Sequence, residues 1–184
     1  MRNHQHKTIP QYGVTYRPLT IDPNDTDFII EAGKLYKHQK EYVHLMALFD
    51  SIKKDSVKAK VACPKCNESI KFDVSRNAVM VDEFQDRLFG NDIKLSVRPY
   101  ITGEEEIYDL IEYVVIDGEQ ILWSDCKESE KEAVLESIDY EVFKSIYSAL
   151  NAPALVANIP VRCSCGHESI VSMRGLEAFL KVVG

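Results

Sequence analysis

The sequence contains two close pairs of cysteines that lie nearly 100 residues apart, and no other feature constrains the fold as strongly. Cys63 and Cys66 are separated by two residues, and Cys163 and Cys165 by one. Zn²⁺ takes four ligands at the corners of a tetrahedron and binds each thiolate sulfur at about 2.3 Å. We therefore predict that the two pairs together bind one structural Zn²⁺ ion, for which the chain must fold back on itself.

The predicted ligand set has one variant and one alternative. His167 closely follows the second pair and is the substitute ligand if Cys163 or Cys165 points away from the ion. Gly166 is able to supply the positive φ that such a tight turn needs. The alternative without metal is a set of buried reduced thiols, because cysteine packs like a small hydrophobic residue. The clustering in two pairs favours the metal, with the four cysteines as its ligands.

The residues around the two cysteine pairs match each other. Residues 61–71 and 161–171 both contain two cysteines followed by Glu-Ser-Ile, in the same order. An Arg-Pro pair stands before an apolar-periodic stretch in each half, at Arg17 and at Arg98. Internal repeats of this kind bear on the architecture of the whole chain. We expect one structural plan that occurs twice, each copy with an Arg-Pro strand, helices and a cysteine knuckle.

This plan predicts an α+β fold, with internally duplicated helical lobes, short β-strands and a zinc-ribbon-like clasp built from the two knuckles. The expected organisation is a flexible N-terminal arm over residues 1–12, a first repeat unit over residues 13–81 and a second, acidic and helical unit over residues 82–184, together in one compact domain. Apolar spacing and turn residues set the expected elements. Strands are expected at residues 13–17, 57–66, 69–74 and 93–98, and helices at residues 22–33, 34–54, 83–88, 102–116, 124–137, 140–150 and 175–183.

The composition is that of an ordinary soluble globular protein, since 45% of the 184 residues are hydrophobic and 28% are charged. No stretch approaches the roughly 18 apolar residues of a membrane span. The polar start, residues 1–7, lacks the hydrophobic region of a signal peptide. We therefore expect a protein of a reducing cytoplasm without a membrane span, where cysteines are more often metal ligands than disulfide partners.

Charge is distributed unevenly along the chain. Residues 82–141 contain 18 Asp and Glu against 5 Lys and Arg. Such an acidic stretch repels the phosphate backbone, so nucleic acid is an unfavoured partner. The acidic stretch has two interpretations: a solvated helix face, or a docking surface for a basic partner protein.

Known catalytic motifs are absent from the sequence. It has no Gly-rich phosphate loop, no His-Glu-x-x-His pair and no Gly-x-Ser-x-Gly nucleophile turn. A zinc ion with four protein ligands leaves no position for water or substrate. Cys126 lies near the expected start of the helix at residues 124–137, where a thiol can be activated, but no His lies near it in the sequence, so a packing role is favoured. We predict that the protein is not an enzyme and takes no small-molecule substrate.

The two Arg-Pro pairs also have two interpretations. Arg17 and Arg98 could each bind an anion beside a helix N-terminus. Alternatively, each arginine ties its strand to a neighbouring acid while the proline ends edge pairing. Because the pair occurs in both halves, a structural role is favoured.

The order of these motifs resembles a known family. Arg-Pro-Leu-Thr at residues 17–20, Cys-Pro-x-Cys at residues 63–66 and an Arg-Pro strand followed by Thr-Gly-Glu-Glu-Glu at residues 102–106 are similar to the baseplate hub assembly and hub subunit proteins of T-even-like contractile-tailed bacteriophages. The resemblance covers most of residues 13–180 and implies a non-enzymatic tail component or assembly factor that binds other hub proteins. It implies the host cytoplasm during assembly, with the virion tail as a further location. The metal-site positions that it implies are Cys63, Cys66, Cys163 and Cys165.

Two other functional classes stay open. A zinc-ribbon regulator that binds nucleic acid or polymerase predicts basic residues beside both knuckles. Only Arg162 and Arg174 flank the second knuckle, whereas five cations flank the first: Lys58, Lys60, Lys65, Lys71 and Arg76.

An enzyme that uses Cys126 or a metal-bound water is the third class.

Overall fold

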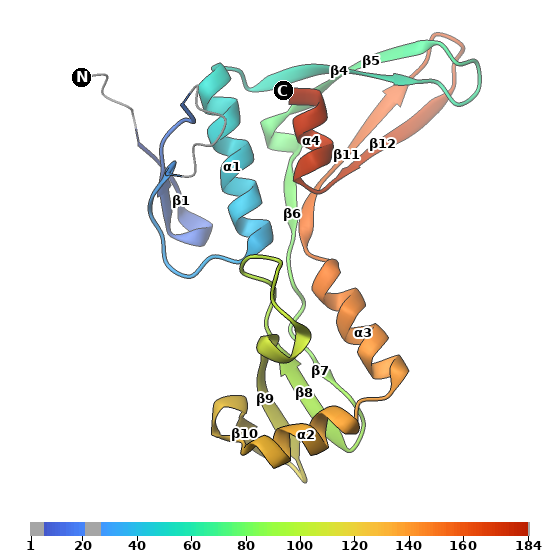
Figure 1. Ribbon diagram of the computed structural model, residues 1–184. Helices are drawn as coiled ribbons and strands as arrows, with labels where there is room; N and C mark the ends of the chain where they lie inside the picture. Colours follow the sequence, from blue (N-terminus) through green and yellow to red (C-terminus); the bar gives the residue numbers. More distant parts are fainter. Residues whose placement is uncertain (1–5, 21–26, 184) are drawn as a thin grey trace. The chain divides into compact units, whose positions relative to one another are not determined.

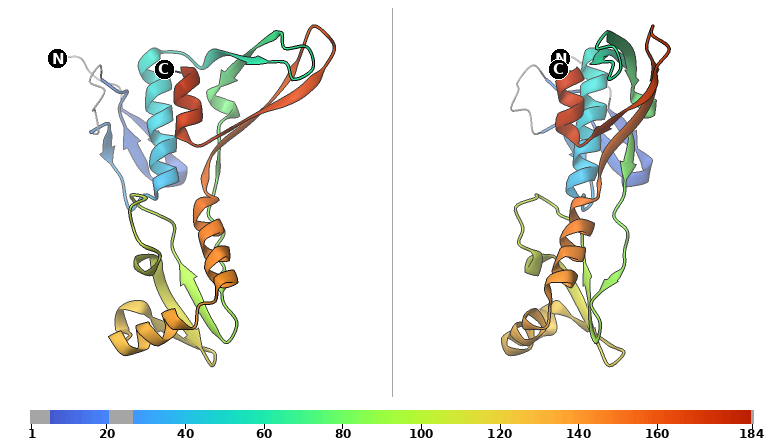
Figure 2. Two further views of the ribbon diagram at one scale, coloured as in Figure 1. Left: turned by 45° about the vertical axis from the view of Figure 1, so that its right-hand side comes forward. Right: turned by 90° about the vertical axis from the view of Figure 1, so that its right-hand side faces the viewer.

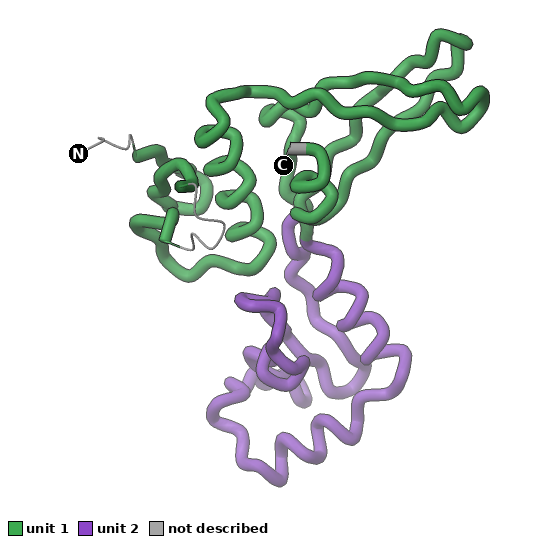
Figure 3. Tube along the Cα trace, turned by 45° about the horizontal axis from the view of Figure 1, so that its top comes forward, with its two compact units in different colours: residues 1–82, 154–184 green, residues 83–153 purple. Residues whose placement is uncertain are grey.

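The computed structural model describes residues 6–20 and 27–183, and the chain forms two compact units (Figure 3). The first unit combines residues 1–82 with residues 154–184, and the second is the continuous stretch of residues 83–153. The first unit therefore contains both cysteine pairs, which reach it from opposite ends of the chain. The stretch expected as a second repeat unit, residues 82–184, is shared between the two units.

The described part of the first unit contains two α-helices and three antiparallel sheets. Helix α1 packs beside α4, as the views in Figure 1 and Figure 2 both show. One sheet has the order β1-β2-β3, a second is the β4-β5 hairpin, and the third has the order β12-β11-β6. The elements are α1 (Lys37–Ile52), α4 (Leu176–Val183), β1 (Lys7–Ile9), β2 (Val14–Tyr16), β3 (Ile29–Glu31), β4 (Ser56–Ala62), β5 (Ser69–Ser75), β6 (Met80–Asp82), β11 (Ala154–Arg162) and β12 (Glu168–Arg174).

The main hydrophobic core of the first unit lies around α1. This helix buries one face, which includes Leu45 and Phe49, against Val14 of β2, Leu155 of β11 and Phe179 of α4, all of them fully buried or nearly so. Apolar residues three to four positions apart form such a face because the helix repeats every 3.6 residues. The same core includes Ala59 of β4 and Ala157 of β11, and the partly buried Phe72 packs against both this core and the separate buried cluster at the hairpin tips.

The two hairpins place the cysteines. β4 and β5 pair from Ser56 opposite Ser75 to Ala62 opposite Ser69, and β11 and β12 pair as far as Arg162 opposite Glu168. Alternation of side chains along β4 buries Ala59 and exposes Lys58 and Lys60, as expected for a strand with one covered face. Figure 1 shows the two hairpins extending in the same direction with their tips side by side.

The second unit is a sheet of order β10-β9-β8-β7 with two helices. Its core is formed by Phe89, Leu95, Val114 and Ile146 with their buried neighbours. Gly90 has φ +112°, and a Cβ there would lie 2.2 Å from the carbonyl oxygen of Ile93, so the β7–β8 turn requires glycine. The elements are β7 (Leu88–Phe89), β8 (Ile93–Val97), β9 (Ile111–Ile116), β10 (Glu119–Leu122), α2 (Glu128–Glu136) and α3 (Tyr140–Asn151).

The α+β class is confirmed. The hairpin predicted from residues 57–66 and 69–74 is confirmed as β4 and β5, and three predicted helices are confirmed as α1, α3 and α4. The helix expected through Ile29 and Ile30 is wrong, because these residues form β3 and pair with β2. The part of that expectation over residues 21–26 lies outside the described residues. The helix expected over residues 124–137 begins later, at Glu128, after a 3₁₀ turn at Trp123–Asp125.

The helix expected over residues 102–116 is also wrong, and the reason is local. The carboxylate of Glu105 turns back to accept the backbone N–H groups of Ile101, Thr102 and Gly103, which fixes a loop where a capping box was expected. The following β-branched residues join the sheet as β9. No helix forms over residues 83–88, where the chain is extended towards β7.

The two Arg-Pro pairs adopt matching local structures. The backbone N–H of Arg17 donates to the carbonyl of Phe28 at 2.9 Å, and that of Arg98 donates to the carbonyl of Leu110 at 2.9 Å. Each acceptor immediately precedes the next strand of the same sheet, and each guanidinium donates to the carbonyl of its own following proline. The described residues do not confirm duplicated helical lobes, since the helices described for the two halves differ in number and position.

Of the N-terminal arm expected over residues 1–12, Lys7–Ile9 form β1 and pair with β2. Residues 1–5 lie outside the described residues.

Candidate metal centre

The four cysteines of the two knuckles meet at the hairpin tips. Their Sγ atoms all lie within 4.8 Å of one another. The Sγ of Cys63 lies 3.9 Å from that of Cys165, and the Sγ of Cys66 lies 3.5 Å from that of Cys163. A tetrahedron with metal–sulfur bonds of about 2.3 Å has edges of about 3.8 Å. The cluster therefore has the dimensions of a tetrathiolate metal site.

The two knuckles use the same backbone hydrogen bonds although the second is one residue shorter between its cysteines. Cys63 N–H donates to the carbonyl of Glu68 at 2.8 Å, and Cys163 N–H donates to the carbonyl of His167 at 2.8 Å. A left-handed residue closes each turn, Asn67 with φ 62° and Gly166 with φ 83°.

The N–H of each of these left-handed residues donates to the carbonyl of the first cysteine of its knuckle, at 2.8 Å in the first and 2.9 Å in the second. The positive φ expected for Gly166 is confirmed. Asparagine is among the few non-glycine residues that adopt this conformation readily, so the first knuckle needs no glycine.

Burial differs within each pair in the same way. Cys63 and Cys163 are 2% and 6% exposed, whereas Cys66 and Cys165 are exposed. The two buried cysteines pack with Ile70 and with Val161, which together form a small cluster at the tips. Each knuckle thus contributes one sulfur anchored in the protein and one at the surface.

Backbone N–H groups and neighbouring thiols set the ionisation of the cluster. The N–H of Cys165 donates to the sulfur of Cys163 and, with the thiol of Cys66, lowers the pKa of Cys163 to about 6. At Cys66 the N–H of Glu68 acts to lower the pKa, but burial and the three other thiols outweigh it and raise the pKa to about 12. The lowered pKa of Cys163 favours a thiolate in the cluster at neutral pH, which is a suitable starting point for metal capture, since metal binding releases thiol protons.

A further contact joins the two knuckles across the chain. The hydroxyl of Ser164 donates to the carboxylate of Glu68, which belongs to the other hairpin. This link was not predicted, although Glu68 stands in the matched Glu-Ser-Ile segment that the alignment of the two knuckles revealed. It orients the two tips independently of the sulfurs.

The remaining candidate residues lie elsewhere. His167 is absent from the set of clustered ligand atoms and contributes its carbonyl to the second knuckle. Cys126 is 8% exposed in the core of the second unit, where its thiol donates to the carbonyl of Leu122 and burial raises its pKa. The guanidinium of Arg98 lies 3.4 Å from the carboxylate of Glu105, as the structural interpretation of the Arg-Pro pairs predicts.

Comparison with protein-family models identifies a family for the chain. A family model described as "T4 bacteriophage base plate protein" matches residues 1–181. No curated protein sequence and no solved structure matches the chain. Among the described residues, no helix has the length and apolar character required to cross a bilayer.

Proposed function

We propose that this chain, which belongs to the family of T4 bacteriophage base plate proteins, is a non-enzymatic hub component or hub assembly protein whose four clustered cysteines bind one structural Zn²⁺ ion. The family indicates a structural role in the phage tail and contacts with other baseplate proteins. The proposal adds the baseplate hub, the host cytoplasm as the place of assembly, and the identity of the metal.

The metal proposal rests on the close contacts between sulfurs of the two hairpins. Each of the two close contacts joins a cysteine of one hairpin to a cysteine of the other, at 3.5 and 3.9 Å. Four neutral thiols have no strong mutual attraction that would hold them at these distances, since S–H is a weak donor. A tetrahedral dication bound to thiolates accounts for all the contacts, and Zn²⁺ is the ion that takes this geometry without redox chemistry.

A site of this kind stabilises structure. Four protein ligands leave no coordination position for a water or a substrate, so Lewis-acid chemistry at the ion is not expected. Cys66 and Cys165 are the exposed pair, but both would be occupied by the metal. The function would therefore reside in the surfaces that the paired hairpins present.

We also propose that residues 13–81 and 82–184 descend from one plan by duplication. The matching hydrogen bonds of Arg17 and Arg98 and the matching knuckle turns support this idea. In this view, the knuckle hairpin of the second copy, β11 and β12, belongs to the compact unit that contains the first copy.

Metal content and partner binding test the proposal together. The purified wild-type chain is expected to contain about one zinc per chain, and Cys163→Ser to contain much less. Cys126→Ser is the matched control, because it changes a buried cysteine outside the cluster and should leave the zinc unchanged. Co-purification from infected cells should recover other baseplate proteins with the wild type. A metal-free wild type that melts normally would refute the zinc proposal, and recovery without any baseplate protein would refute the structural one.

A nucleic-acid-binding function is the second candidate, and one surface feature favours it. Lys58, Lys60 and Lys71 are exposed on the β4–β5 hairpin, and Lys65 is exposed in its knuckle. The second hairpin has no comparable set, and its Arg162 lies beside Glu168. Titration with duplex DNA at increasing salt distinguishes the candidates, because phosphate contacts make binding steeply salt-dependent. Tight, salt-dependent binding would favour the second candidate over the first.

A further inference from the structure

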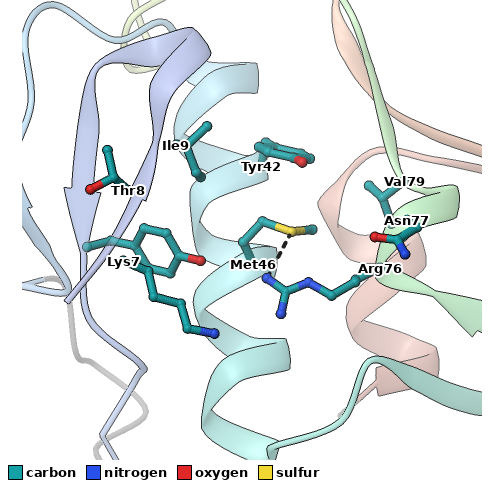
Figure 4. A pocket seen from close by; sticks show the side chains of 9 residues that line it. Lys7, Thr8, Ile9, Tyr42, Met46, Arg76, Asn77 and Val79 are labelled. Atoms are coloured by element: carbon teal, nitrogen blue, oxygen red, sulfur yellow. Dashed lines mark hydrogen bonds between the residues drawn. The ribbon is translucent and has the colours of Figure 1, made fainter. Parts of the chain in front are cut away.

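A cavity of about 530 Å³ lies in the first unit between β1, α1 and the 3₁₀ turn Arg76–Ala78, and none of the four clustered cysteines lines it. Figure 4 shows Lys7 and Arg76 reaching towards each other in front of α1, with Met46 beside the guanidinium of Arg76. Cavities that bind small ligands or single side chains typically measure about 300–1,000 Å³. The site is of that size and is independent of the proposed metal.

A buried carboxylate fixes the positions of the two cations. The side chain of Asp50 is 3% exposed, and its Oδ1 accepts from Lys7 Nζ at 2.5 Å and from Arg76 Nη1 at 2.8 Å. Its Oδ2 accepts from the hydroxyl of Tyr16 at 2.8 Å. Burial acts to raise the pKa of Asp50, but these donors outweigh it and hold the pKa below its ordinary value. The cations are therefore ordered before any ligand arrives.

The cavity wall retains an excess of positive charge. Lys7 and Arg76 share the single buried carboxylate of Asp50, and the Lys7 side chain is 44% exposed. Among the residues that the structure describes, the acceptor of Arg76 Nη2 is the weakly accepting sulfur of Met46, at 3.7 Å. Asp55 lies 3.7 Å from Arg76, but its side chain is 90% exposed and does not line the cavity, so water screens it.

The rest of the lining suits a carboxylate on an apolar stem. Ile9, Tyr42 and Val79 provide hydrophobic walls, and Asn77 places an exposed amide at the cavity. An excess of one positive charge matches a monoanionic carboxylate better than a doubly charged phosphate. A guanidinium edge beside an ammonium group is an arrangement that binds carboxylates with directed hydrogen bonds.

We propose that this cavity is a docking site for an acidic segment of a partner protein, which inserts a Glu, Asp or C-terminal carboxylate between Lys7 and Arg76. Its position in a unit with 16 Lys and Arg against 12 Asp and Glu adds long-range attraction for such a segment. The inserted carboxylate takes the Nη2 edge of Arg76 and a free proton of Lys7, and its methylene groups contact Tyr42 and Val79.

Fluorescence anisotropy of a labelled hexaglutamate peptide with the full-length chain tests this proposal at low salt. Hexaglutamate is expected to bind and hexaglutamine is not. Asn77→Asp places a negative charge in the lining without removing a partner of Asp50, and it should weaken binding by about tenfold or more. Asn158→Asp is the matched control: it makes the same charge change in the same unit, at an exposed position on β11 outside the cavity, and should leave binding nearly unchanged.

Thr8→Glu, on β1, is a second lining variant, and it decides the question if Asn77→Asp lowers the melting temperature. Equal losses in the lining variants and in Asn158→Asp would show diffuse attraction to a basic surface and overturn the site. Absence of hexaglutamate binding to the wild type would overturn it as well. The site would also be overturned if inorganic phosphate displaced the peptide more readily than acetate did, or if an oligothymidylate bound more tightly than hexaglutamate. Either result would show that Lys7 and Arg76 bind phosphate in preference to carboxylate.

Discussion

In the second unit, residues 83–153 are continuous in sequence and close around one apolar core that includes Leu95, Val114 and Ile146. The first unit is assembled from two distant stretches, and its main core around α1 does not reach the hairpin tips. At those tips the described residues form a buried cluster of four members, two of which are cysteines. A two-stranded hairpin is marginally stable by itself. The four clustered cysteines therefore lie in the part of the first unit where the buried apolar cluster is small.

The largest expected effect comes from removal of the proposed metal. A chelator or Cys63→Ser should release the hairpin tips, because structural zinc contributes on the order of 10 kcal/mol to the folding of small sites. Hydrogen exchange should then accelerate over residues 56–75 and 156–174 while β8 and α3 keep their protection. An equal acceleration of hydrogen exchange in the second unit would contradict this difference between the two units.

The next effect concerns the buried carboxylate of the first unit. Asp50→Asn should lower the free energy of unfolding at neutral pH by about 3 kcal/mol, because it leaves two cations with a weaker partner. The pKa of Asp50 is depressed in the folded chain, so its stabilisation is present above the unfolded value of about 3.9 and is lost as pH falls. Denaturant unfolding should therefore show the two proteins converging below about pH 4. Asp55→Asn, at an exposed position, should change little at any pH.

A smaller effect is expected in the second unit. Glu105 accepts backbone N–H groups and lies beside Arg98, and although burial acts to raise its pKa, these donors hold the pKa well below the ordinary value. Glu105→Gln replaces one acceptor oxygen by a donor and should cost about 1–2 kcal/mol. Thermal unfolding at neutral pH measures this loss, which should shrink as pH falls below the usual glutamate pKa. A comparable loss in Glu104→Gln would indicate a general charge effect instead.

The smallest effect is expected for the cysteine outside the cluster. Cys126→Ala should cost about 1 kcal/mol, because it removes one buried sulfur from the apolar core of the second unit. Zinc content should stay at the wild-type value. Loss of metal in this variant would mean that the ligand set includes Cys126 and that the cluster at the hairpin tips is not the site.

The sequence predicted the proximity of the cysteines and much of the first unit. Paired cysteines within matching segments, such as Glu68-Ser69-Ile70 and Glu168-Ser169-Ile170, indicated that the two knuckles belong together. The 3.6-residue spacing of apolar residues located α1 and α3. These features are local, or are repeated in the chain, so pattern reasoning reaches them.

Contacts between residues far apart in the sequence explain what the sequence did not predict. Apolar residues 107–115 fit a helix by spacing, but pairing with β8 and β10 made most of them a strand. The contacts of Lys7, Asp50 and Arg76 connect residues far apart in the sequence, and no local motif marks them. No local motif marks the division into compact units either, because residues 154–184 belong to the same unit as residues 1–82, from which residues 83–153 separate them in the sequence.

X-ray absorption at the zinc edge of the purified full-length protein tests the central claim most directly. The account predicts about one zinc per chain with four sulfur neighbours at about 2.3 Å, and fewer sulfur neighbours in Cys66→Ser. Absence of zinc from the wild type, or a first shell dominated by nitrogen and oxygen, would contradict it.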